Sequence, residues 1–209
     1  MDACQPSPGL PAGAASQRRD EVGAVSEPDA MSRRDIAAEM ERARVTFDRL
    51  LADASPDDLR RPSDGTKWTN EQLLFHMLFG FLIVRALLVL VRMFGRLPDG
   101  MSRGYASVLN AANRPFHVVN YWGSRVGARV FGAARMGHKL DEVIDVLQRR
   151  LSAETEQGLA RRMHFPTRWD PFFADTMTLA HVYHYASQHF DYHRGQLTLG
   201  PGSSLTPFG

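Results

Sequence analysis

The chain has 209 residues, of which 44% are hydrophobic, so it can bury a substantial core within one domain. Its single cysteine, Cys4, excludes an internal disulfide framework and a cysteine-rich zinc site, and it suits a reducing, cytoplasmic location. Any metal ion must therefore be held by histidines or carboxylates. The formal net charge of +2 is too small to indicate nucleic acid as a specific partner.

The first 30 residues are rich in Pro, Gly, Ala and Ser, with neither apolar periodicity nor the basic start and apolar stretch of a secretory signal. We expect a disordered tail over 1–30, a folded domain over 31–200 and a short C-terminal tail over 201–209. Met31 is either the true start of the chain or the first residue of the domain.

Two long helices are predicted in the first half of the domain. Residues 33–53 repeat apolar side chains at helical spacing, and Ser32 precedes them as a cap. After a polar connector, the sequence TNEQ from Thr69 is a capping box, and an apolar helix continues from it through Phe94.

The apolar stretch Leu73–Phe94 is long enough to cross a bilayer. However, Arg85 and Arg92 would each cost about 2.5 to 3.5 kcal/mol at the membrane centre. A helix buried in a bundle therefore fits better than a transmembrane span.

A basic segment follows over 96–135, with several glycines and two prolines. Between Arg92 and Lys139 there are eight basic residues and one acidic residue, Asp99, a net charge of +7. We expect one or two short helices, inserted between the second and third long helices. Three roles stay open: packing against the bundle or a dimer partner, a lid, and a surface over 92–139 for anionic ligands or a membrane.

Two further long helices are predicted in the second half. An apolar stripe over 140–151 indicates the third helix, which ends near Gly158. In the sequence WDPFF, Asp170 is suited to cap a fourth helix with Pro171 at its first position, running to about 196. No strand is predicted, so the expected class is all-α.

Two histidines four residues apart, His189 and His193, stand in the sequence QHFDYHRGQL. Side chains at this spacing share one face of a helix, about 6 Å apart along its axis, so two imidazoles can share one metal ion. Apolar residues at three- and four-residue steps put both on the core-facing stripe, as they do His76 on the second helix. A core-facing histidine by itself is more often a packing residue than a ligand.

The three histidines can meet in only one arrangement. His76 is near the start of the second helix and the pair is near the end of the fourth, so these helices must be antiparallel. A connection of about 40 residues before the third helix is long enough to cross the bundle, giving an up-down-down-up four-helix bundle.

The sequences KWTNEQLLFHM and HFDYHRGQL together resemble the DinB/YfiT-like superfamily, whose members are regarded as metalloenzymes. The resemblance covers about 33–197 and depends on a Trp and a His eight residues apart, followed by His-x-x-x-His-x-Gly-Gln-Leu. It implies the same up-down-down-up four-helix bundle, with His76, His189 and His193 as metal ligands. The basic segment over 96–135 departs from the family pattern.

Three neutral imidazoles leave open coordination positions on a divalent ion, Zn or Ni by ligand type, which is typical of a catalytic site. Such an ion can activate water for hydrolysis or a thiol as nucleophile. The resemblance implies either, since its members include hydrolases and enzymes that use low-molecular-weight thiols such as mycothiol. We therefore expect a metal-dependent S-transferase or hydrolase acting on a small molecule. The alternative is a non-catalytic, metal-stabilised, stress-related binding protein.

Several neighbours have two interpretations each. Tyr185, one turn before His189, is a candidate catalytic residue or a packed core tyrosine. Gln196 orients a ligand or ends the helix, Trp68 packs or forms a substrate wall, and His181 is a weak candidate for supporting a metal ligand. Four histidines are predicted to be polar or packing residues: His117, His138, His164 and His184.

Overall fold

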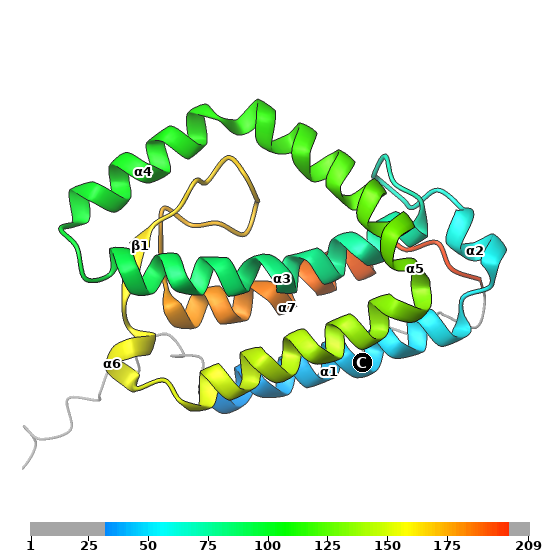
Figure 1. Ribbon diagram of the computed structural model, residues 1–209, viewed down its shortest axis with the longest axis horizontal. Helices are drawn as coiled ribbons and strands as arrows, with labels where there is room; N and C mark the ends of the chain where they lie inside the picture. Colours follow the sequence, from blue (N-terminus) through cyan, green and yellow to red (C-terminus); the bar gives the residue numbers. More distant parts are fainter. Residues whose placement is uncertain (1–31, 201–209) are drawn as a thin grey trace, which may run out of the picture. The chain divides into compact units, whose positions relative to one another are not determined.

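The computed structural model describes residues 32–200. The predicted tails over 1–30 and 201–209, and Met31, lie outside the described residues. Helix predominates in the described part, in agreement with the predicted all-α class (Figure 1). The elements are α1 (Arg33–Asp53), α2 (Pro56–Arg60), α3 (Asn70–Phe94), α4 (Asp99–Ala111), α5 (Asn113–Ser152), α6 (Glu156–Leu159), β1 (Arg162–His164), β2 (Thr176–Thr178) and α7 (Leu179–Arg194).

The helices α1 and α3 begin where their capping sequences predict. The Ser32 side chain accepts a hydrogen bond from the Asp35 amide at the start of α1. At the start of α3, the Thr69 side chain accepts from the Gln72 amide, and the Gln72 side chain accepts from the Thr69 amide. Such reciprocal bonds satisfy amides that have no partner within the helix.

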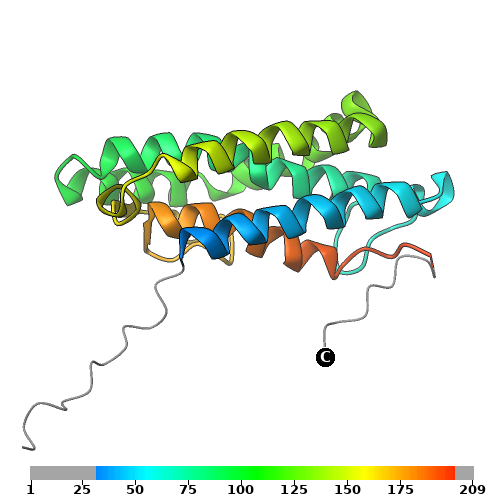
Figure 2. The ribbon, with the colours of Figure 1, turned by 90° about the horizontal axis from the view of Figure 1, so that it is seen from below.

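Four long helical segments surround one hydrophobic core: α1, α3, α7 and the C-terminal part of α5. Figure 2 shows α1 beside both α7 and this part of α5. The helices α3 and α7 run antiparallel: His76 near the start of α3 lies against His193 near the end of α7, and Gly80 farther along α3 packs on His189. At the other end of α3, Arg92 contacts Tyr183 and pairs with Glu154, just beyond α5.

The start of the last helix differs from the prediction. The helix α7 begins at Leu179 with Thr178 as its cap, not at Pro171. Residues before it are extended because β1 and β2 pair antiparallel, with Arg162 opposite Thr178. The prediction that the chain has no strand was therefore wrong. Asp170 lies in the loop between the two strands, where its side chain accepts from the Phe172 amide, so it caps a turn instead of a helix.

The inserted segment forms longer helices than expected. After α4, the helix α5 continues to Ser152, and its C-terminal part includes the apolar stripe over 140–151. The predicted end of this helix near Gly158 was wrong, because the chain leaves α5 at Ala153 and Gly158 lies in the separate short helix α6. The chain bends at Gly132, whose φ of 62° and ψ of 162° lie in a region that side-chain-bearing residues avoid. Figure 1 shows α4 and the first part of α5 arching over α3, with the loop between β1 and β2 beneath them.

Among the described residues, α3 alone is long and apolar enough to cross a membrane. More than half of its most apolar window is buried, at 56%, and the helix packs against both α5 and α7. This is the pattern of a core helix, as the two arginines in the sequence predicted.

Candidate metal centre

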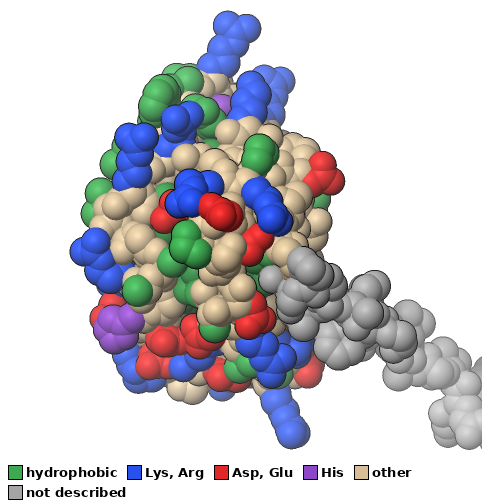
Figure 3. Space-filling model, turned by 90° about the vertical axis from the view of Figure 1, so that its right-hand side faces the viewer, with side chains coloured by type: hydrophobic (Ala, Val, Ile, Leu, Met, Phe, Trp, Pro, Cys, Tyr) green, Lys and Arg blue, Asp and Glu red, His purple; other side chains and the backbone are tan. Residues whose placement is uncertain are grey.

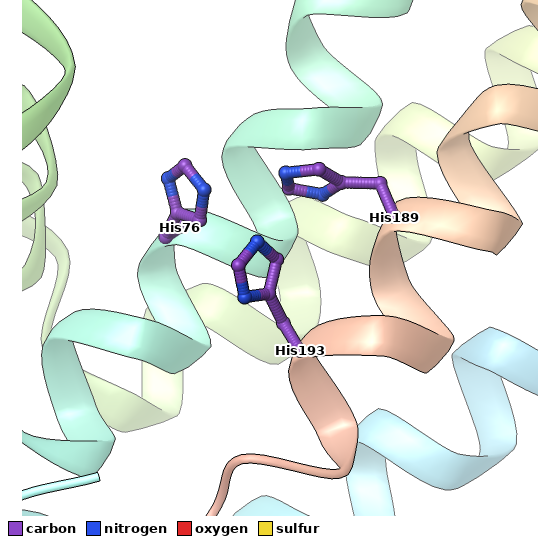
Figure 4. A group of neighbouring side chains, drawn as sticks. All are labelled: His76, His189 and His193. Atoms are coloured by element: carbon purple, nitrogen blue, oxygen red, sulfur yellow. The ribbon is translucent and has the colours of Figure 1, made fainter. Parts of the chain in front are cut away.

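Three histidine rings converge between α3 and α7. Figure 4 shows His76 from α3 and His189 and His193 from α7 pointing toward one another. Each offers one ring nitrogen, and these atoms all lie within 4.8 Å of one another. Gly80 makes the approach possible, because a Cβ atom there would lie only 2.6 Å from His189 Nδ1. The predicted candidates are thus brought together by the antiparallel packing of two helices.

Hydrogen bonding fixes the tautomer of His76. Its Nδ1 lies 3.2 Å from the Ser124 hydroxyl, which donates its own proton to the Asn120 carbonyl at 2.9 Å. The hydroxyl oxygen must therefore accept from His76 Nδ1–H, so Nε2 carries the free lone pair. The inserted part of α5 thereby prepares a ligand on α3, as partners of metal-binding histidines usually do.

The two histidines of α7 are prepared differently. His193 Nδ1 lies 2.7 Å from the Gln196 side-chain oxygen, an acceptor, which leaves Nε2 of His193 free. His189 Nδ1 is buried and has no hydrogen-bond partner among the described residues. A buried polar atom without a partner is rare. Three imidazoles with available lone pairs, one of them otherwise unsatisfied, fit a divalent metal ion.

Burial keeps these rings neutral. It lowers the pKa of His76 to about 3, with a further contribution from the neighbouring His193. Burial also lowers the pKa of His189 well below its ordinary value, and the pKa of His193 despite the opposing hydrogen bond to Gln196. Neutral imidazole is the form that binds metal ions, so the group is competent to do so at neutral pH.

A family model described as the DinB superfamily matches residues 39–197. The chain belongs to the DinB superfamily. No curated protein and no solved structure matches it. The predicted family resemblance is confirmed, and the matched span of this DinB superfamily chain contains all three histidines of the group.

A carboxylate that was predicted to cap a helix lies at the site instead. Asp170 Oδ2 is 3.9 Å from His189 Nε2 and accepts a hydrogen bond from the Tyr185 hydroxyl at 2.8 Å. Its other oxygen accepts from the Phe172 amide at 2.9 Å. Burial, reinforced by the charge of Asp170, raises the pKa of Tyr185 well above its ordinary value, so the hydroxyl stays protonated. The sequence WDPFF is compatible both with a helix cap and with a turn, so it does not reveal that Asp170 lies beside the histidines.

An apolar cavity of about 190 Å³ adjoins the group. His76, His189, Asp170, Tyr185 and Asn120 are among its polar lining residues, while most of its wall is aliphatic or aromatic. A separate, more open groove lies on the side of His193. The polar or aromatic residues of this groove include Lys67, Trp68, His117, Tyr121 and Gln196.

The remaining candidates have other partners. Trp68 stacks on His76, with ring centroids 4.4 Å apart, and so packs directly behind one candidate ligand. The His181 ring accepts from the Thr178 amide at the start of α7, far along the helix from His193. Within residues 32–200, five histidines stay outside the three-histidine group: His181 and the four that were predicted to be polar or packing residues, His117, His138, His164 and His184.

Proposed function

We propose that this protein is a metal-dependent enzyme acting on a small molecule, with His76, His189 and His193 as the metal ligands. One observation carries the proposal: three neutral imidazoles, two of them buried and one half-buried, converge beside a cavity that can receive a substrate. A divalent ion, Zn or Ni by ligand type, supplies Lewis acidity and lowers the pKa of a bound water or thiol. Three protein ligands leave positions for exogenous groups.

Of the two expected reactions, S-transfer is favoured over hydrolysis. The histidine group lies between the apolar cavity, which His76 and His189 line, and the open groove, which His193 lines. A transferase needs two binding sites, whereas a hydrolase needs one site and water. The groove, with Lys67 and Gln196, suits a polar low-molecular-weight thiol. This thiol comes from solution, because Cys4 is the only cysteine in the chain.

The chain's own residues have distinct roles in the proposed transfer. The thiol reaches the histidine group from the groove and loses its proton to Asp170, which lies beside His189 and is held by hydrogen bonds from Phe172 and Tyr185. Its sulfur then forms a bond to an electrophilic carbon of the substrate, and the leaving group departs with the electron pair of the broken bond. Tyr185, the predicted catalytic residue, acts here by orienting Asp170.

We interpret the scaffold as the predicted up-down-down-up four-helix bundle. The antiparallel directions of α3 and α7 support this interpretation. So does the pairing of α1 with α5, where Gln148 donates to the carbonyl of Ala37 while Gly137 packs on Asp48 at the other end of α1. The connection through α4 and the first part of α5 is what lets α3 and the end of α5 run parallel.

The proposal is tested by thermal-shift titration of the zinc-loaded and zinc-free protein with N-acetylcysteine, and with N-acetylserine as the matched non-thiol. Stabilisation by the thiol alone, and only when zinc is bound, is the expected result. Zinc binding without a response to the thiol would favour hydrolysis. Absence of zinc binding would contradict both reactions.

A non-catalytic role is the second candidate, since a metal ion that joins α3 to α7 would also stabilise the core. In that case a chelator lowers the melting temperature, and neither thiols nor small-molecule substrates change it. The two candidates thus differ in the response of the zinc-loaded protein to ligands.

A further inference from the structure

The cavity beside the three-histidine group is closed by the inserted part of the chain. Its inner wall belongs to α3, and its outer wall comes from α4, the start of α5 and the loop between β1 and β2. Trp169 of this loop donates a hydrogen bond to the Leu109 carbonyl at 2.7 Å and stacks on Phe116, with ring centroids 4.0 Å apart. The segment over 96–135, which departs from the family pattern, thus supplies part of the outer wall through Tyr105, Leu109, Phe116 and Asn120.

The size and lining of the cavity limit what it can hold. In another protein, a cavity of about 150 Å³ lined by Leu, Ile and Phe binds benzene. The present cavity, of about 190 Å³, has room for one ring or a branched alkyl group of similar size. No Lys or Arg lines it, so in the zinc-free protein a carboxylate or phosphate would lose its hydration without gaining a cationic partner. Typical wall residues are Phe79, Ile83, Leu87, Leu109 and Phe173.

The polar atoms of the cavity lie together. Tyr185 donates to Asp170, and Asp170 lies beside His189. A ligand in the cavity thus has its hydrocarbon part against α3 and α4 and its reactive part beside the candidate metal ligands.

We infer that this cavity binds the uncharged, apolar part of the substrate, a group of about the size of one aromatic ring. The inference rests on the proposed function only for the reaction of the bound substrate at the metal site. Binding of the apolar group requires only the cavity. The walls formed by α3, the inserted segment and the loop between β1 and β2 together select the substrate class, and the histidines act on the group that extends from the cavity toward them.

Ligand-detected ¹⁹F NMR with fluorobenzene, and with 4-fluorobenzoate as the charged counterpart, tests the inference. Fluorobenzene should bind to the wild type and the benzoate should not. Leu109→Trp fills the cavity and should weaken fluorobenzene binding at least tenfold. Val108→Trp is the matched control, because Val108 is adjacent on α4 but 67% exposed and outside the cavity. Leu87→Phe provides a second cavity-filling variant on α3.

Fluorobenzene binding that is absent, or unchanged in both cavity-filling variants, would overturn the inference. So would preference for the benzoate. Zinc content is measured on the same samples. If the protein binds fluorobenzene but no zinc, the cavity is supported and the proposed function is contradicted. If the protein binds zinc but not fluorobenzene, only the inference about the cavity is contradicted.

A second, independent observation concerns the outer surface of α5. Five apolar residues there are each more than half exposed, which is unusual for one side of one helix. We call them the apolar face: Val118, Val119, Trp122, Val126 and Val130.

Basic side chains accompany this face. Arg114, Arg125 and Arg129 share the helical segment, and the sequence has no acidic residue between positions 100 and 140. The Arg125 guanidinium lies 5.1 Å from the Trp122 ring centroid. In Figure 3, basic and hydrophobic side chains gather in the upper part of the view, and acidic side chains gather lower.

We propose that the apolar face binds an anionic membrane surface, with the arginines at the lipid headgroups and the apolar side chains below them. A second copy of the chain is a poorer occupant, because a two-fold interface would set the same arginines against each other. An apolar substrate that dissolves in lipid would be enriched at such a surface.

Cosedimentation with vesicles of phosphatidylcholine, and of phosphatidylcholine with 30% phosphatidylglycerol, tests this second proposal. Binding should need the anionic lipid, fall as salt rises, and weaken at least fivefold in Trp122→Ser. Val45→Ser, an exposed apolar residue of α1, is the control and should bind as the wild type. Equal binding to both vesicles, or no binding, would overturn the proposal. So would a Trp122-dependent dimer in sedimentation velocity without vesicle binding.

Discussion

Two buried histidine environments in this protein differ in their partners more than in their burial. His76 is 5% exposed and faces two other imidazoles, and its pKa is lowered by burial. His164 is 6% exposed, but its two ring nitrogens lie 3.1 Å from Asp99 and 3.2 Å from Asp175. Burial opposes protonation of His164 as well, yet the hydrogen bonds to Asp175 and Asp99 outweigh it and raise its pKa.

The comparison separates two uses of a buried histidine. A neutral imidazole with no more than one of its nitrogens engaged by a neighbour keeps the lone pair of the other nitrogen for a metal ion. An imidazole between two carboxylates has a partner at each nitrogen and binds its proton more tightly, and here it joins the start of α4 to the strands β1 and β2. Burial alone therefore does not identify a ligand, whereas the set of neighbouring groups does.

Removal of the metal ion should have the largest effect. At a free zinc concentration about 100-fold above the Kd, binding stabilises the folded state by about 2.7 kcal/mol, or roughly 5 to 10 °C in Tm for a chain of this size. A chelator should lower the Tm of the zinc-loaded wild type by this amount and leave His76→Ala unchanged. An equal change in Tm for the wild type and His76→Ala in differential scanning fluorimetry would contradict the role of His76 as a metal ligand.

The next largest effect is expected from removal of the side chains that fix the tautomers of His76 and His193. Ser124→Ala and Gln196→Ala each remove the acceptor that holds the Nδ1–H of a candidate ligand. We expect about 10- to 100-fold weaker zinc binding in each, by competition with a chromophoric chelator. Ser107→Ala, an exposed serine on α4, is the control. Unchanged affinity in both variants would show that the tautomers are not fixed by these contacts.

A side chain added between α3 and His189 should lower the free energy of unfolding by an amount similar to the loss in zinc binding above. Gly80→Ala places a Cβ atom 2.6 Å from His189 Nδ1, and this buried contact should destabilise the fold by about 1 to 3 kcal/mol in urea unfolding. Gly104→Ala, at a helical glycine of α4 with nothing within 4 Å, should instead stabilise it by about 0.5 to 1 kcal/mol. The same sign for both would contradict the close approach of α3 and α7.

The pH dependence of His164 is the smallest expected effect. Because its pKa is raised on folding, its ion pairs stabilise the fold fully below about pH 6.5, the unfolded pKa. This contribution is lost as the pH rises through the folded pKa. The stability difference between wild type and His164→Gln should therefore decrease from pH 5.5 to 8.5 in urea unfolding. A constant difference would mean that the pKa of His164 is not raised on folding.

The histidine site was predictable because its signals are local. Capping residues and apolar periodicity define α1 and α3, and the i,i+4 spacing of His189 and His193 puts them on one face of α7. Only their meeting with His76 is a tertiary feature, and the long connection before the last part of α5 was enough to permit it.

The surroundings of the site were less predictable for equally physical reasons. Asp170 and Pro171 satisfy the rules for a helix start, but the pairing of Arg162 with Thr178 keeps the chain extended, and that pairing is not visible in either segment alone. Likewise, several glycines lie between 96 and 135, and only Gly132 takes the positive φ that bends α5. The outer wall of the cavity depends on both features.

The central claim is that His76, His189 and His193 bind one divalent metal ion. Elemental mass spectrometry of protein purified without chelator tests it directly, on the wild type, His189→Ala and His138→Ala, the last being an exposed histidine outside the group. We predict about one metal ion per chain in the wild type and in His138→Ala, and less than a tenth of that in His189→Ala. A wild type without metal, or metal retained in His189→Ala, would contradict the claim.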